Sequence, residues 1–430
     1  MGGIYMADKD VIKQPVFRYI ENKRDEIVRT LSELVRIPSL TGQEAEAQKY
    51  MHRLYSTLGL KVTAMDADHD KIRRHKAYVK SEFDYKGRPN IIGVREGKPP
   101  ARSLVLNGHI DVVSPEPVAQ WEFPPWEGRA VGNKLYGRGA CDMKAGLIAN
   151  YYALKALLET GFNPEGTVIL QSVIEEETMA GGGTLACLLE GFTADGLIIT
   201  EPNMKIIIAH PGVIFFKVKV IGKSAHAGMA HTGVNAIGKM NRVYDALVEL
   251  DEKRAQDNRY PLFEKHAGRS CHLNIGTCRA GDWISTVAGW AELDCRMSHL
   301  PAESVDEVKR QVQQAVKKAA ESDEWLRQHP PEVIWYERQV IPWEQAPDDP
   351  FILAFKSAAD STLKSDIDIV GATWGMDTRF APFFNMPAIS FGPNGENIHG
   401  VNEYVAIDSV IDCTKVLAAF IMDWCGVQKA

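Results

Sequence analysis

Histidine and acidic residues occur at five places that lie far apart in the chain, each at the end of a predicted strand or in the loop just beyond it. They are His109 and Asp111 in NGHIDVV, Asp142 in GRGACDMKAG, the triplet Glu175 to Glu177, Glu201 in TEP, and His399 in NIHGVNEYV. Strands of an open α/β sheet bring their carboxyl ends together at one crevice. Burying a charged side chain at the end of a buried strand costs free energy unless the charge is paired or binds a cation. We therefore expect these side chains to gather around metal.

The types of these side chains indicate which metal and which chemistry. Imidazole nitrogens with carboxylates and no thiolate suit Zn²⁺ or a similar first-row ion, and two such ions that share a carboxylate are typical of hydrolases that activate water. In a strand, residues two apart lie on the same face, so we expect the Asp111 carboxylate to accept the second ring N–H of His109. A single histidine or a single glutamate triplet more often lies on the surface or in the core without a functional role. Their common place at strand ends favours the metal site.

The elements that must position these residues alternate between strand and helix. Runs that are apolar on both faces, such as SLVLNGHIDVV and TVILQSVI, indicate strands covered on both sides. Residues 144–161 between them have helical periodicity, and residues 15–60 predict amphipathic helices with a turn at 38–42. The charged stretch 66–86 predicts a solvated excursion. The fold class is therefore α/β, with a mixed, mostly parallel sheet flanked by helices.

A second pattern begins near Gly212. It reads strand, helix, strand, strand, helix, strand, which is the order of a ferredoxin-like α+β unit. The α/β pattern then returns near residue 342. We therefore predict a catalytic domain of residues 1–210 and 342–430, with an inserted domain of residues 211–341.

Composition limits the partners and the compartment. The chain of 430 residues has a net charge of -7 and no dense basic run, which argues against nucleic acid as a partner. No apolar stretch is long enough to cross a bilayer, and the N-terminal residues lack an export signal. Seven cysteines without a C-x-x-C pair fit a reducing cytosol, so we predict a cytoplasmic protein that makes no membrane contact. We interpret Cys141 as a small semi-buried thiol, not as a nucleophile.

In their order along the chain, these motifs resemble the M20 family of metallohydrolases. Besides the five places above, the resemblance rests on GKSAHAG and GMDTRF. That family contains acetylornithine deacetylase, succinyl-diaminopimelate desuccinylase, aminoacylases and glutamate-releasing carboxypeptidases. The resemblance implies a catalytic α/β domain interrupted by a ferredoxin-like lid domain that usually dimerises, and so a homodimer formed through residues 211–341.

The resemblance also implies a set of metal ligands. His109, Asp142 and Glu201 match the ligands of one Zn²⁺, and Asp142, Glu177 and His399 match those of a second, with Co²⁺ or Mn²⁺ as possible substitutes. The peptide bond after Asp142 is expected to be cis. The first acid of the glutamate triplet is usually Asp in the family, and here it is Glu175.

The remaining matches concern catalysis and substrate binding. Glu176 matches the general base and Asp111 the residue that orients the first histidine. His226 resembles the lid histidine that, in dimeric relatives, reaches the oxyanion of the other subunit's substrate. Arg379 matches the position that holds a substrate carboxylate, with a structural ion pair as the competing interpretation. The lid departs from many relatives at residues 282–286, where DWIST replaces an Asn-Val-Ile-Pro run, so the pocket differs from that of the desuccinylase.

Four functions compete. The first is a di-zinc amidohydrolase, most like acetylornithine deacetylase, that removes a small acyl group from the nitrogen of an amino acid or related amine. The second is a dipeptidase or carboxypeptidase on the same scaffold. The third is a deformylase of an N-formyl aminopyrimidine. The fourth, a metal-binding dimer without activity, would require the loss of ligands or base, and all of these residues are present.

Overall fold

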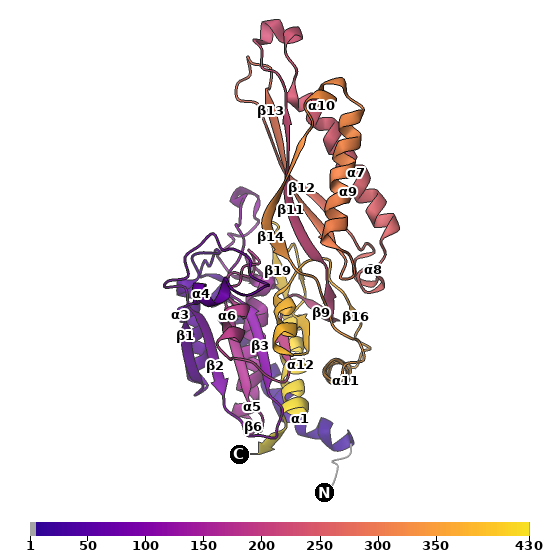
Figure 1. Cartoon of the computed structure of the whole chain (residues 1–430). Helices are drawn as coiled ribbons and strands as arrows, with labels where there is room; N and C mark the ends of the chain where they lie inside the picture. The colour runs from indigo at the N-terminus through magenta and orange to yellow at the C-terminus, as the bar shows by residue number, and fades with distance from the viewer. Residues whose placement is uncertain (1–5, 430) are drawn as a thin grey trace. The chain divides into compact units, whose positions relative to one another are not determined.

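The computed structural model describes residues 6–429, with the side chains of residues 6–10 left undescribed, and it divides into two compact units (Figure 1). Unit 1 comprises the chain up to Ile208 together with residues 345–369 and the chain from Met376 onward. Unit 2 comprises Ala209–Glu344 and Val370–Gly375. The two units are described in turn.

Unit 1 is built on a mixed sheet with the strand order β1-β2-β7-β3-β8-β17-β9-β16. The central strands β7, β3, β8 and β17 are parallel, whereas β1, β2 and β9 run antiparallel to their neighbours. The α/β class predicted from the sequence is confirmed. The strands are β1 (Lys61–Met65), β2 (Asn90–Arg95), β3 (Leu104–His109), β7 (Val168–Val173), β8 (Leu197–Ile199), β9 (Asn203–Ile207), β16 (Ile369–Val370) and β17 (Ala388–Gly392).

Helices cover both faces of this sheet, which explains why β3 and β7 are buried along their whole length. On one face, a Cβ at Gly108 would lie 2.9 Å from Leu147, so the glycine allows α5 to pack closely. On the other face, the Asn107 side chain donates to the Thr184 hydroxyl of α6 at 3.1 Å. The helices of unit 1 are α1 (Met6–Asn22), α2 (Arg24–Val35), α3 (Ala45–Thr57), α4 (His69–Ile72), α5 (Ala145–Glu159), α6 (Thr184–Leu189), α11 (Pro350–Leu363) and α12 (Ile407–Cys425).

Residues 66–86 are not the wholly solvated excursion that the charge pattern predicted. They contain the short helix α4, and Ile72, Val79 and Tyr85 are buried. The sequence pattern did not indicate that these apolar residues are buried, because charged residues separate them and they do not recur with a helical or strand period.

A small second sheet in unit 1 places two irregular loops side by side. Its order is β18-β19-β5-β4, and Tyr404 of β19 lies opposite Tyr136 of β5. The loop after β5 and the loop before β19 therefore leave the same end of an antiparallel pair. The short strands of this unit are β4 (Arg129–Val131), β5 (Lys134–Tyr136), β18 (Gly395–Glu396) and β19 (Tyr404–Ala406), with β6 (Phe162–Pro164) and β20 (Val427–Lys429) forming a separate pair.

Unit 2 follows the strand and helix order that the sequence indicated. Its antiparallel sheet has the order β12-β13-β11-β14, and α7 and α9 pack on it around a core that includes Phe216, Val243 and Val312. Alternate residues of β13 are buried, as expected for a strand covered on one face. The elements are β10 (Ala209–His210), β11 (Gly212–Ile221), α7 (Ala236–Asp257), α8 (Pro261–Ala267), β12 (Leu273–Ala280), β13 (Trp290–His299), α9 (Val305–Glu321), α10 (Glu324–Gln328), β14 (Glu332–Val340) and β15 (Trp343–Glu344).

Among the described residues, none of the helices combines the length and the apolar character that a membrane crossing requires.

Candidate active site

The ends of three neighbouring parallel strands bring acidic and imidazole side chains together. His109 is the last residue of β3, Glu176 and Glu177 follow β7, and Glu201 follows β8. Because β7, β3 and β8 lie side by side and point the same way, their carboxyl ends meet at one edge. The convergence expected from the apolar runs is therefore present for these residues.

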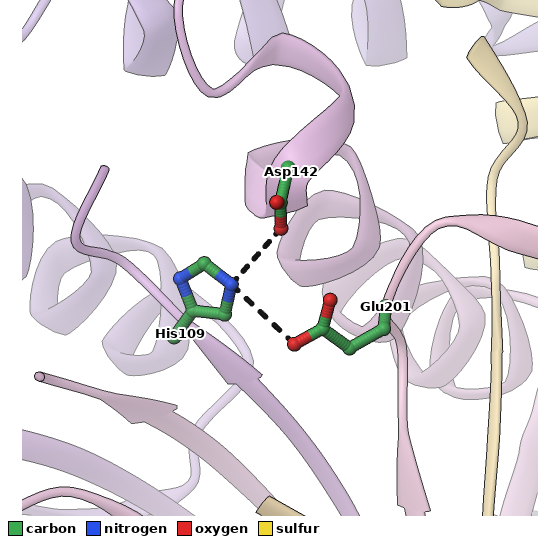
Figure 2. Close-up of side chains that lie close together, drawn as sticks. All are labelled: His109, Asp142 and Glu201. Carbon is green, nitrogen blue, oxygen red and sulfur yellow. Dashed lines mark hydrogen bonds and ion pairs between the residues drawn. The ribbon is translucent and has the colours of Figure 1, made fainter. Parts of the chain in front are cut away.

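His109 lies between two carboxylates (Figure 2). Its Nε2 atom is 3.1 Å from Oδ1 of Asp142 and 3.5 Å from Oε1 of Glu201, and all three residues are buried. One ligand atom from each lies within 4.8 Å of the others, so the three can hold a metal ion together.

A second group shares Asp142 with the first. Nε2 of His399 lies 3.2 Å from the other carboxylate oxygen of Asp142 and 2.9 Å from Oε2 of Glu177. These three residues also satisfy the distances for holding a metal ion. The carboxylate of Asp142 thus faces one histidine with each oxygen, and both groups include it.

Asp142 and His399 come from the loops beside the small sheet, not from the main sheet. Asp142 lies in the irregular segment Ala140–Lys144, where Asp142 and Met143 have non-helical backbone angles, and its peptide bond to Met143 is cis, as expected from the family resemblance. His399 precedes β19 and has a left-handed backbone with φ 61°. The pairing of β5 with β19 brings the two loops together.

Asp111 orients His109 through its backbone and not, as predicted, through its carboxylate. Nδ1 of His109 lies 2.9 Å from the carbonyl oxygen of Asp111 and 3.6 Å from its Oδ1. The strand ends at His109, so the period-two geometry assumed for Asp111 does not apply. The carboxylate instead accepts the backbone N–H groups of Glu176 at 3.1 Å and Glu177 at 3.2 Å, and the hydroxyl of Thr41 at 2.9 Å.

The three glutamates of the triplet have different surroundings. Glu175 accepts from Arg88 at 3.2 Å, and Arg88 also donates to Glu44 at 2.8 Å, so Glu175 belongs to a buried ion network and to neither metal-ligating group. Glu176 is buried, and its Oε1 has no hydrogen-bond partner among the described residues. Glu177 contacts His399 through one oxygen, and its other oxygen is likewise unpartnered.

The site has a surplus of negative charge. Burial and the nearby charge of Glu201 raise the pKa of Glu176 well above its ordinary value, and burial and the charge of Asp142 do the same to the pKa of Glu201. Hydrogen bonds to Asp142 and Glu177 raise the pKa of His399 to about 11. Buried carboxylates with unpartnered oxygens are stabilised by cations, so this set of donors fits two metal ions.

Arg379 does not have the surroundings of a substrate contact. Its side chain is 1% exposed and pairs with Asp377 at 3.2 Å. Its terminal nitrogens donate to the carbonyl oxygens of Met376 and Met179, both at 3.0 Å. The burial of Arg379 favours the structural ion pair over a substrate contact, and its role in substrate binding stays a prediction.

His226 lies in unit 2, at the start of the 3-10 segment Ala227–Thr232. It is exposed, and its Nδ1 accepts the backbone N–H of Gly228 at 3.1 Å. The nearby loop exposes Trp283 and Ile284, which are 69% and 92% accessible. The catalytic role of His226 stays a prediction.

Two residues beside the site were missed by the sequence reasoning. Arg138 and Glu403 form a buried ion pair, and Glu403 accepts the backbone N–H of Asp142 at 3.1 Å. Both residues stand inside the motifs around Asp142 and His399. Their presence in those motifs was the only available signal, because nothing in the residue pattern shows that they are buried against each other.

Known proteins resemble this chain along most of its length. A model of peptidase family M20/M25/M40 matches residues 105–423. The chain is 27% identical over 441 residues to the N-formyl-4-amino-5-aminomethyl-2-methylpyrimidine deformylase of Halalkalibacterium halodurans, an alignment that covers 97% of this chain and 98% of the relative. It is 32% identical over 252 residues to a probable succinyl-diaminopimelate desuccinylase of Staphylococcus epidermidis, covering 56% of this chain and 57% of the relative.

Solved structures share the fold. The crystal structure of human carnosine dipeptidase 1 matches with a TM-score of 0.71 and 19% sequence identity, over 96% of this chain and 99% of that chain. Together with the family match, this likeness accounts for the mixed sheet and its flanking helices. The chain belongs to peptidase family M20/M25/M40 and is a hydrolase that acts on amide bonds.

Proposed function

We propose that this protein is a di-metal amidohydrolase that cleaves the amide bond of an N-acylated amine. The observation that carries the proposal is the position of Asp142, whose two oxygens face His109 and His399 at 3.1 and 3.2 Å. A carboxylate held between two imidazoles in this way suits a pair of cations with a shared ligand.

The two groups supply the ligands of the two ions. His109, Asp142 and Glu201 would hold one, and Asp142, Glu177 and His399 would hold the other. Imidazole and carboxylate donors without thiolate favour Zn²⁺, with Co²⁺ or Mn²⁺ as substitutes. Bound cations at this place supply Lewis acidity toward a substrate carbonyl and toward water.

Glu176 is the general base in this proposal. It is buried, the charges of His109, Glu201 and Glu177 act on it, and it belongs to neither group. One of its oxygens has no hydrogen-bond partner in the described chain. Its carboxylate would accept a proton from the attacking water and return it to the leaving amine. Asp111 supports this role because it holds the backbone N–H of Glu176 at 3.1 Å.

An N-formyl aminopyrimidine is our first candidate substrate. The relative named as a deformylase of such a compound aligns over 97% of this chain, whereas the desuccinylase relative aligns over 56%. The burial of Arg379 also removes one reason to expect a substrate with a carboxylate. N-acyl amino acids, as in acetylornithine deacetylase, are the second candidate, because any small acyl group on an amine suits the same chemistry.

Unit 2 would act as a lid and dimerisation domain. Its exposed histidine, His226, would donate to the oxyanion that forms on the substrate, from the other subunit of a homodimer. The proposal of a separate domain with boundaries near 211 and 341 is supported by the compact unit of Ala209–Glu344, which also includes Val370–Gly375. We also propose that the protein is cytoplasmic.

A substrate panel tests this function. The purified protein, loaded in turn with Zn²⁺, Co²⁺ or Mn²⁺, is incubated with the N-formyl aminopyrimidine, N-acetylornithine, other N-acetyl and N-formyl amino acids, N-succinyl-diaminopimelate and dipeptides. Released formate, acetate, succinate and amino acids are measured. We expect formate from the first compound at the highest kcat/KM. Absence of turnover on every amide, with two metal ions bound per chain, would reject the amidohydrolase.

A further inference from the structure

Arg138 and Glu403 form an ion pair that lies beside both metal-ligating groups and belongs to neither. Nη1 of Arg138 donates to Oε2 of Glu403, and the two side chains are 1% and 0% exposed. The pair has no net charge, so it does not offset the surplus of negative charge in the site. A buried ion pair is also weak evidence for stability on its own. The other hydrogen bonds of the two residues indicate what they do.

Glu403 holds the backbone of the segment that carries Asp142. Its carboxylate accepts the N–H groups of Gly139 at 3.1 Å, Cys141 at 3.0 Å and Asp142 at 3.1 Å. Gly139 has φ 76°, and Asp142 and Met143 have non-helical backbone angles, so these N–H groups have no regular series of helical hydrogen bonds to join. With the bond from Arg138, the carboxylate accepts from about as many donors as its four lone-pair sites allow. The side chain of Glu403 therefore holds the backbone of Asp142 and of two residues before it.

Arg138 extends the same network to the loop that carries His399. Its Nη2 donates to the carbonyl oxygen of Gly400, the residue after His399, at 2.9 Å, and to that of Ser114 at 3.3 Å. The backbone N–H of Gly137 also donates to the carbonyl oxygen of Glu403 at 2.9 Å. The segment with the shared carboxylate and the loop with the second histidine are thus joined by one buried pair.

We propose that Arg138 and Glu403 are positioning residues that fix Asp142 and His399 relative to each other, and so set the affinity and geometry of the second metal ion. The inference rests on the proposed function, since it concerns an ion held by those two residues. The ligand atoms of Asp142 and His399 lie only 3.2 Å apart, so a small shift of either loop changes the separation that an ion must fit. Residues that orient metal ligands typically contribute about 10- to 100-fold in metal affinity.

The test is Co²⁺ binding to the full-length Glu403→Gln variant. Binding of each ion is measured by competition with a chelator, and the visible absorption of the Co²⁺-loaded protein reports ligand geometry. We expect about 10- to 100-fold weaker binding of the second ion and an altered spectrum. Parental affinity and an unchanged spectrum, in a parent that binds two ions, would overturn the inference. A parent that does not bind two ions would instead overturn the proposed function, and this inference with it.

A matched variant separates positioning from stability. Arg254 and Glu303 form another largely buried pair, at 2.8 Å, in unit 2. We expect Glu303→Gln to lower the stability of the metal-free protein without changing Co²⁺ affinity or spectrum. If Glu403→Gln fails to fold, the double variant Arg138→Gln/Glu403→Gln replaces it, because it leaves no buried charge unpaired. Weakened binding of the second ion by the double variant supports the positioning role, and parental binding contradicts it.

Discussion

The ring of His109 donates a hydrogen bond from Nδ1 to the backbone carbonyl oxygen of Asp111, at 2.9 Å. A carbonyl oxygen can only accept, so Nδ1 carries a proton, and Nε2 is the ring nitrogen that can bind a cation. The carboxylate of Asp111 meanwhile accepts the backbone N–H groups of Glu176 and Glu177. Asp111 therefore orients the histidine with its main chain and the glutamate loop with its side chain.

Substitution Asp111→Asn should reduce turnover without releasing metal. The backbone carbonyl that fixes the His109 tautomer is unchanged, so both metal ions should remain bound. The carboxylate accepts one N–H group on each oxygen, whereas the amide nitrogen of asparagine cannot accept, so the loop of Glu176 should shift. We expect kcat to fall about 10- to 100-fold, by analogy with other residues that orient a site. Loss of one metal ion from Asp111→Asn, measured by elemental analysis, would show that the carboxylate orients His109 after all.

Substitution Glu176→Gln should abolish most activity and leave both metal ions in place. Glu176 belongs to neither metal-ligating group. Removal of a general base typically lowers kcat about 10²- to 10⁴-fold. The same change one residue later is the matched control, because Glu177 contacts His399 at 2.9 Å and Glu177→Gln should lose metal. An active Glu176→Gln enzyme would assign the base to another residue.

Two of the candidate metal ligands could be located from the sequence because of where they stand relative to strands. His109 and Glu201 end or follow runs of buried apolar residues, and such runs become the central parallel strands of the sheet. The carboxyl ends of neighbouring parallel strands meet, so proximity follows from topology alone. The same reasoning identified the sheet, the helix that became α5, and the element order of unit 2.

The contacts of individual side chains could not be predicted in this way. Arg379 stands in a motif that suits substrate binding, yet its direction depends on the fold of residues 376–384 and on Met179, which is 200 positions away. The sequence does not distinguish the role of Glu175 from that of Glu176. The distinction comes from the ion pair between Glu175 and Arg88, at 3.2 Å. The burial of Glu403 and Arg138 against each other likewise depends on tertiary packing, which the local spacing of residues does not predict.

Metal binding should release protons. In the metal-free protein, Asp142 and Glu177 raise the pKa of His399 to about 11, so its ring is protonated at pH 8. A cation binds only the neutral ring, and the proton must leave. Affinity should therefore increase with pH below this pKa, by about one unit of log K per pH unit for each proton released.

Calorimetry tests this release. Zn²⁺ is titrated into the metal-free protein at pH 8 in buffers with different enthalpies of ionisation. The observed heat should vary with the buffer, with a slope that counts the protons. His399→Ala should release fewer protons than the parent. A heat that does not depend on the buffer would contradict the protonated state of the site.

Substitution Arg379→Met should act on stability and not on substrate affinity. The variant leaves the carboxylate of Asp377 buried without its partner, and removal of one member of a buried pair typically costs about 3–5 kcal/mol. Urea unfolding should show this loss, and the double variant Arg379→Met/Asp377→Asn should recover part of it, since no buried charge is then left alone. KM of the folded fraction should stay at the parental value. If Arg379 instead bound a substrate carboxylate, KM would rise by more than about tenfold while the free energy of unfolding changed little.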